Sequence, residues 1–193
     1  MLKKQLLLSL ILVSSLSYSQ RVYWASELLD FSSELSAYEY SAEQVLGKPN
    51  ALPQGGDSPN AWMPAKPTKL EFISVAFDKS IRVQQIIIAE SYNPSAVYEI
   101  YLYNKNGNEF LVHTFDPRPV DIKGRLLRIN IEKTNYQVEA LRIIVDGRKV
   151  PGYSGIDSIA VSGSNRPIEI EIEQPEYLVE EIVVERLSDN ITS

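Results

Sequence analysis

The chain lacks cysteine altogether, and of its 193 residues only one is histidine and two are methionine. Without cysteine there can be no disulfide, no thiolate metal site and no lipidated N-terminal cysteine. A zinc site needs three or four nitrogen or sulfur ligands, which His113 cannot supply alone. Positive charge is scarce too, with a net charge of −6 and no basic run. This argues against nucleic acid and anionic lipid headgroups as partners.

Enzymatic chemistry has little support in the sequence. His113 is the one histidine that a Ser-His-Asp set could use, and it lies in the strand-like segment Glu109–Phe115 with no converging acid or serine in the pattern. The Gly55-Gly56 pair lacks the lysine and the following helix of a phosphate-binding loop. Paired carboxylates for glycoside hydrolysis cannot be dismissed by number, but no acid is singled out by its context. We therefore predict a protein that is not an enzyme and read His113 as a strand histidine.

The N-terminus has the pattern of a signal peptide over residues 1–19. Lys3 and Lys4 form a positive region, Leu6–Val13 is apolar, and small residues precede Gln20. The apolar run is too short for a stable transmembrane span. Removing it takes the net charge to about −8. An exported chain without disulfides suits the periplasm, outer membrane or surface of a Gram-negative bacterium.

The central part of the chain is predicted to be all-β. Short alternating or β-branched segments are separated by turn signals, including Asp78-Lys79-Ser80 and the hairpin signal Asn106-Gly107. One short helix is expected over Ser41–Leu46, ended by Gly47 and Pro49. The expected strands are Leu70–Phe77, Val83–Ala89, Val97–Tyr103, Glu109–Phe115, Leu126–Ile131, Ala140–Val145 and Ile156–Val161. This number and spacing of strands are typical of a β-sandwich.

The order of these segments resembles a discoidin-like domain, one of the galactose-binding-like jelly rolls that include coagulation-factor C-type domains. The resemblance rests on the helix signal, the long loop to Trp62, the hairpin Tyr98–Gly107 and the closing segment Asp157–Val161. It covers roughly residues 25–163 and implies a jelly-roll β-sandwich domain over 20–165 with Trp62 in its core. The family's frequent disulfide between the termini is absent.

In that family the ligand is bound by loops at one end of the sandwich. The resemblance therefore directs attention to the loops Asn50–Met63, Ser91–Ala96 and Pro151–Gly155. Aromatic faces and planar amides are suited to pyranose rings and their hydroxyls, although the same residue types also build turns. The predicted glycan-binding residues are Asn50, Asp57, Asn60, Tyr92, Asn93 and Tyr153.

A calcium ion is a second expectation from the resemblance. Some relatives hold a structural ion between the early loop and the closing strand. Asp57 would be its carboxylate ligand here, joined by Glu43, although no D-x-D-x-D-G string is present.

Residues 166–193 form an acidic segment that we expect to be an extended tail or linker. Isoleucine and glutamate alternate over 168–173 between Pro167 and Pro175, as in an edge strand. The ending is similar to the entry of a propeller in outer-membrane-associated proteins of Bacteroidetes-type bacteria, so the chain could be complete or a fragment of a longer protein. Two functions fit the sequence: an exported module that binds glycan, and a protein-interaction or scaffolding domain of an envelope complex.

Overall fold

A computed structural model describes residues 21–168, 170 and 178–184 of the chain. This part holds one 3-10 helix, η1 (Ala42–Val45), and nine strands. The strands are β1 (Tyr23–Phe31), β2 (Leu70–Ile81), β3 (Gln85–Tyr92), β4 (Val97–Asn104), β5 (Glu109–Thr114), β6 (Arg125–Ile131), β7 (Val138–Asp146), β8 (Gly155–Ser162) and β9 (Leu178–Val184). No helix of the described residues is long and apolar enough to cross a membrane.

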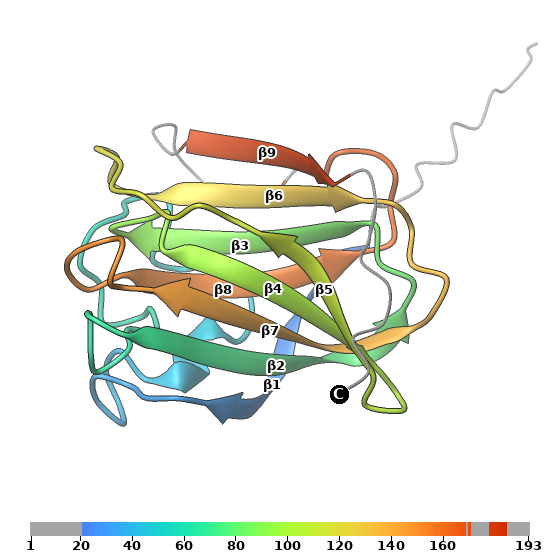
Figure 1. Cartoon of the computed structure of the whole chain (residues 1–193), viewed down its shortest axis with the longest axis horizontal. Coiled ribbons are helices and arrows are strands. Elements are labelled where there is room, and N and C mark those ends of the chain that lie inside the picture. The colour runs from blue at the N-terminus through green and yellow to red at the C-terminus, as the bar shows by residue number, and fades with distance from the viewer. Residues whose placement is uncertain (1–20, 169, 171–177, 185–193) are drawn as a thin grey trace, which may run out of the picture.

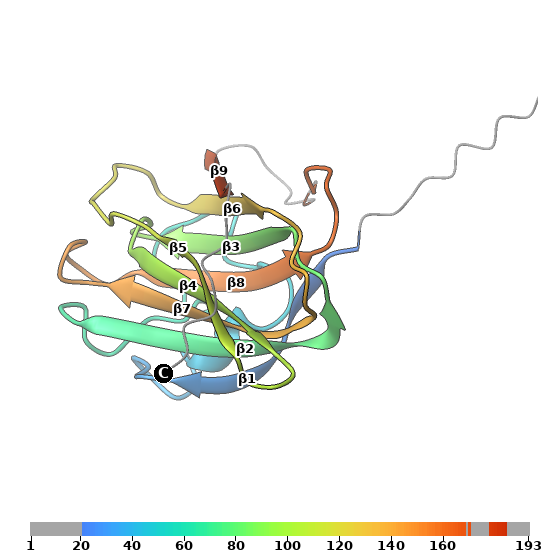
Figure 2. The same ribbon diagram turned by 45° about the vertical axis from the view of Figure 1, so that its right-hand side comes forward.

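The strands form two packed layers joined through β1 (Figures 1 and 2). The continuous order is β5-β4-β7-β2-β1-β8-β3-β6-β9. Tyr23 and Trp24 of β1 pair with β8, whereas the rest of the strand pairs with β2 across two register shifts. All neighbours are antiparallel except β6 and β9, which are parallel. The predicted jelly-roll β-sandwich is therefore confirmed, with one parallel pair that the sequence did not indicate.

The buried apolar side chains form two clusters, and the larger one holds the layers together. The larger lies between the sheets and includes Ile73 and Val75 of β2, Ile100 of β4 and the fully buried Trp62. The smaller covers the outer face of the β8-β3-β6 sheet, where Leu52 and Ile168 lie over Ile87, Ala89, Leu126 and Ala160. Because β3 is buried on both faces, its sequence reads as a continuous apolar run.

All seven predicted strands are present, and the predicted short helix is the 3-10 turn η1. The predicted turn at Asp78-Lys79-Ser80 is wrong. These residues continue β2, which stays paired to β7 through a register shift as far as Ile81 and Val138. Their polar character reflects exposure of this end of the strand, because Asp78 and Lys79 are both exposed.

The predicted ends of the domain, at residues 20 and 165, can be compared with the structure only in part. Residues 1–19 lie outside the described residues, and so does most of the isoleucine–glutamate alternation. Within the predicted tail, β9 pairs with β6 over its whole length, from Arg125 with Leu178 to Ile131 with Val184. Residues 178–184 of the acidic segment thus belong to the sheet.

Gly147 allows the start of β2 to approach the end of β7. Its backbone N–H donates to the carbonyl of Lys69, and a Cβ atom at this position would lie 2.2 Å from the carbonyl oxygen of Pro67. Gly107, by contrast, has φ +77° and open space around it.

We expect Gly147→Ala to destabilise the fold by about 3 kcal/mol, because the backbone of 67–69 must move. Gly107→Ala is the matched control, costing about 1 kcal/mol through its dihedral angles alone. Urea unfolding followed by tryptophan fluorescence measures both. Equal losses in the two variants would show that the contact with Pro67 is not tight.

Candidate functional site: the loop end

Four connections gather at one end of the sandwich, which we call the loop end. They are residues 32–69, 93–96, 115–124 and 147–154, and they lie at the left of Figure 1. The strand registers place them together, since Leu70 pairs with Asp146, Glu90 with Arg125, and Tyr92 with Gly155. The three loops predicted from the sequence all belong to this end, and the 115–124 connection is a further member that the sequence did not single out.

Asn93 and Tyr153 are the predicted residues that the structure brings closest. The Asn93 amide nitrogen donates to the carbonyls of Pro151 and Tyr153, at 3.1 Å each. Asn93 itself has φ +43°, a left-handed conformation that asparagine tolerates better than most residues. Tyr153 is 37% exposed, whereas Tyr92 is half-buried beside Gly155. Asn93 thus fixes the loop that presents the Tyr153 ring to solvent.

The predicted residues Asp57 and Asn60 lie on the 32–69 connection, and neither is hydrogen-bonded to Asn93 or Tyr153 in the described structure. The Gly56 N–H donates to the Ser91 carbonyl at 2.7 Å, which ties the Asp57 loop to the end of β3. The Asp57 carboxylate, however, is hydrogen-bonded to the Tyr40 hydroxyl, and this bond raises the pKa of Tyr40. Asn60 is exposed. The geometry therefore joins Tyr92, Asn93 and Tyr153, while Asp57 is engaged with the 38–40 segment.

A buried carboxylate that the sequence analysis did not select holds the long connection in place. Asp157 of β8 is fully buried, and its Oδ1 accepts the Asn50 N–H at 3.0 Å. Its Oδ2 accepts the backbone N–H groups of Ala51 and Leu52, at 3.1 and 2.9 Å. Burial raises the pKa of Asp157, and the three amides oppose that shift. The exposed Asn50 is thus fixed through its backbone.

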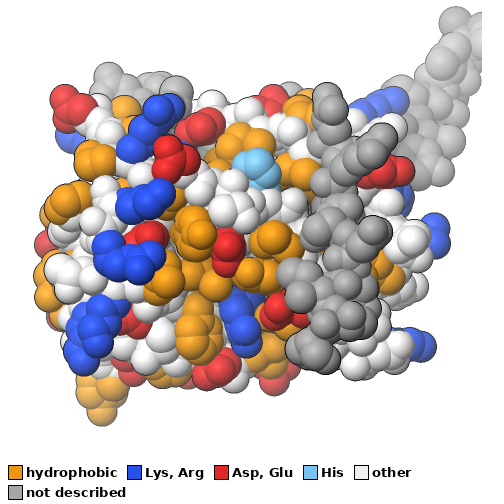
Figure 3. All heavy atoms as spheres, viewed as in Figure 1, with side chains coloured by type: hydrophobic (Ala, Val, Ile, Leu, Met, Phe, Trp, Pro, Cys, Tyr) orange, Lys and Arg blue, Asp and Glu red, His pale blue; other side chains and the backbone are white. Residues whose placement is uncertain are grey.

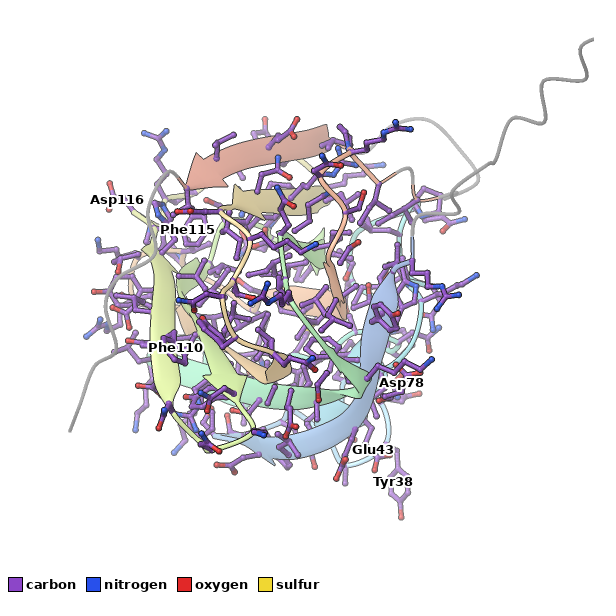
Figure 4. All side chains as sticks on the ribbon, turned by 90° about the vertical axis from the view of Figure 1, so that its right-hand side faces the viewer. Tyr38, Glu43, Asp78, Phe110, Phe115 and Asp116 are labelled. Carbon is purple, nitrogen blue, oxygen red and sulfur yellow. The ribbon has the colours of Figure 1, made fainter. Side chains whose placement is uncertain are left out.

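This arrangement gives no support to the predicted calcium site. Amide N–H groups converge between the early loop and the closing strand, whereas a calcium ion needs oxygen lone pairs there. Among the described residues there is no group of three or more histidine, cysteine or acidic side chains placed to hold a metal. Glu43 is the exposed residue of η1, and its side chain points outward in Figure 4. Asp157 therefore joins the loop and the strand directly.

A second buried carboxylate supports the 93–96 connection. Glu90 is 1% exposed, and its Oε1 accepts the Ser95 N–H at 2.8 Å, while its Oε2 accepts the Arg125 Nε–H at 2.6 Å. Arg125 also pairs with Glu180 of β9. Burial raises the pKa of Glu90, and Arg125 opposes that shift. Replacing only one partner of a buried ion pair leaves the other charge buried and unpaired. We therefore expect replacement of Glu90 or Arg125 alone to destabilise the fold.

Trp62 and His113, which the sequence analysis singled out, both pack against neighbouring residues. Trp62 exchanges backbone hydrogen bonds with Ile156, and its indole N–H donates to the Ser33 carbonyl at 3.0 Å. The predicted burial of Trp62 is confirmed. His113 lies on β5 with its ring edge-on to Phe115, at 4.5 Å between centroids. The structure thus gives Trp62 and His113 packing roles.

Comparison with known structures identifies the class of the fold. A chain of reduced XRCC1 bound to the DNA pol beta catalytic domain superposes with a TM-score of 0.57 at 13% identity, covering 75% of this chain and 99% of that one. Chitosan-binding module 1 from the chitosanase/glucanase of Paenibacillus sp. IK-5 gives 0.52 at 19% identity, with coverages of 72% and 97%. A pectin-binding carbohydrate-binding module gives 0.52 at 15% identity, with coverages of 82% and 99%. These likenesses show that the chain has the fold of these proteins, the jelly-roll β-sandwich that the sequence predicted.

The sequence also matches a defined family. The family described as "Pappalysin-1, SD scarf domain, C-terminal" matches residues 17–169, and the chain belongs to it. F-box/LRR-repeat protein 4 of Bos taurus is 22% identical in an alignment of 176 positions that covers 74% of this chain. The match spans 28% of the length of that relative.

Replacing Asp157 tests the support of the long connection. Asp157→Ala leaves three backbone amides, two of them buried, without acceptors, so we expect a loss of about 3 kcal/mol in the free energy of unfolding. Asp157→Asn keeps one acceptor oxygen and should lose less. Asp78→Ala, at an exposed position of β2, is the control and should change stability by less than about 0.5 kcal/mol. A urea series decides the order, and an Asp157→Ala protein as stable as the control would contradict this role.

Proposed function

We propose that the protein is an exported, non-catalytic module of a Gram-negative cell envelope that binds glycan at the loop end. The observation that carries the proposal is the exposed Tyr153 ring, held beside Asn93 and Tyr92 by connections from both layers of the sandwich. An aromatic face packs against the apolar side of a pyranose, and neighbouring amides bond its hydroxyls. The chitosan-binding and pectin-binding modules on the same fold support this proposal.

A second candidate, a protein-interaction domain, rests on a different surface. Four large apolar side chains, Leu29, Leu35, Tyr38 and Leu70, are exposed on β1, the connection after it and the start of β2. Exposed apolar side chains of this size are typical of contacts with other proteins when they form one patch. The XRCC1 chain of the same fold was solved bound to a protein domain. Loss of a protein partner on Leu29→Ser or Leu35→Ser, with glycan binding intact, would favour this function.

Glycan binding is tested by a glycan array followed by calorimetry with the purified chain. A shallow site predicts dissociation constants of about 0.1–1 mM. Tyr153→Ala should weaken binding about tenfold or more, because the stacking face is lost, while the unfolding midpoint stays unchanged.

Val183→Ala is the control for loss of an exposed apolar side chain. Val183 is 69% exposed and pairs with Asn130, at the end of β6 away from the loop end. It should leave glycan affinity unchanged. An array without any bound glycan would end the glycan proposal and leave the protein-interaction function.

Export is tested separately. Mature protein from the periplasm or cell surface should begin at Gln20, because the small residues before it form a cleavage site. Intact mass and N-terminal sequencing provide the measurement. Mature material that keeps Lys3 and Lys4 would contradict the signal peptide.

A further inference from the structure

Basic side chains gather along the rim of the loop end, although the chain is acidic as a whole. Figure 3 shows lysine and arginine side chains in a column at the left of the viewed face, where the loop end lies in Figure 1. Four of the exposed basic residues at this end are Lys69, Arg118, Arg148 and Lys149, and we call them the basic strip. They come from three connections, so no basic run marks them in the sequence.

Hydrogen bonds and charge interactions link the three connections that carry these residues. The Lys69 carbonyl accepts the N–H of Gly147, which directly precedes Arg148 and Lys149. The Lys149 ammonium lies 2.9 Å from the Asp116 carboxylate. This hydrogen bond lowers the pKa of Asp116, and the positive charge of Arg118 lowers it further. The connections that carry the strip are thus neighbours, and Asp116 lies within the influence of both Lys149 and Arg118.

The strip carries more positive than negative charge. Its two acidic partners are Asp116 and Asp146, against four cations. Arg148 is fixed by two hydrogen bonds of 2.8 Å to the buried Asp146 carboxylate, and its side chain remains 56% exposed. Asp116 differs because its side chain is 84% exposed. An exposed ion pair is worth little, so another carboxylate can replace Asp116 at Lys149 at small cost.

The same connection carries the aromatic residue of the proposed glycan site. Lys149 and Tyr153 both lie in 147–154, with buried Val150 between them. The Asn93 bonds to Pro151 and Tyr153 hold this connection against the end of β3. A ligand stacked on Tyr153 therefore has the strip beside it along one short, supported segment.

We infer that the loop end takes an acidic glycan, whose sugar ring packs on Tyr153 while its carboxylates meet the basic strip. This inference rests on the proposed function and names its ligand class. Arginine and lysine bind carboxylates through charge-assisted hydrogen bonds, and the Asp116–Lys149 pair shows such a carboxylate in place. A nucleic acid fits less well, because four cations, two of them paired, are few for a phosphate backbone and the chain's net charge is −6.

The test compares polygalacturonate with its fully methyl-esterified form, which keeps the sugar but removes the charge. The purified wild-type chain should bind polygalacturonate about tenfold more tightly at low salt, and the advantage should shrink as NaCl rises from about 50 to 300 mM. Lowering the pH below the uronate pKa, about 3.5, should abolish the advantage while the sugar remains.

Variants locate the effect. In the double variant Arg118→Gln/Lys149→Gln, the affinity ratio between the two polymers should fall about fivefold. Lys79→Gln/Lys105→Gln removes the same charge at the other end of the sandwich and should keep the wild-type ratio. Unfolding midpoints of both variants confirm that they are folded, and the salt dependence of wild type is an independent measure.

Each outcome separates the inference from the proposed function. Equal binding of the two polymers would overturn the acidic class and leave glycan binding intact. Absence of binding to any glycan would overturn both. Tighter binding of a single-stranded oligonucleotide, or of phosphatidylglycerol vesicles, would show that the strip recognises phosphate instead. An equal fall of the ratio in the control variant would show that net charge, not the strip, sets the preference.

Discussion

The loop end depends on one buried carboxylate. Asp157 lies near the start of β8, yet its three bonds go to backbone amides more than a hundred residues earlier. A charge in the interior is stable only when its hydrogen bonds are satisfied, so the loop and the strand constrain each other. The same loop places Leu52 in the smaller apolar cluster, on the outer face of the sheet, and Trp62 in the larger cluster between the sheets. The 32–69 connection, which borders the proposed binding surface, thereby packs against both faces of the sheet that contains β8, β3 and β6.

The strands that the sequence predicted well are those with regular burial. The segments that became β3, β4 and β8 show clear apolar runs or alternation, and the structure confirms them. β1 was missed because Ala25 is its one buried residue and its register shifts twice, which destroys the period of two. The same reasoning explains the wrong turn at 78–80, where an exposed strand end has the composition of a loop.

The site was predicted less completely, for a physical reason. Turn chemistry and the family resemblance located three of its four connections, including Asn93 and Tyr153. Asp157 and Glu90 were missed because their partners are backbone amides and one distant arginine, and nothing in the neighbouring sequence indicates burial of charge. The basic strip is also a product of folding, since its members are dispersed among acidic residues. Only the three-dimensional arrangement concentrates them.

The pairing of β1 with β8 has a consequence for how the molecule reaches its folded state. Tyr23 faces Val161, so the two layers close only when nearly the entire domain is available. Contacts this distant in sequence slow folding, because a long loop must be ordered before they form. An early half of the chain cannot complete the sandwich by itself. The sandwich is therefore completed only after β8 has been synthesised, because β1 must pair with it.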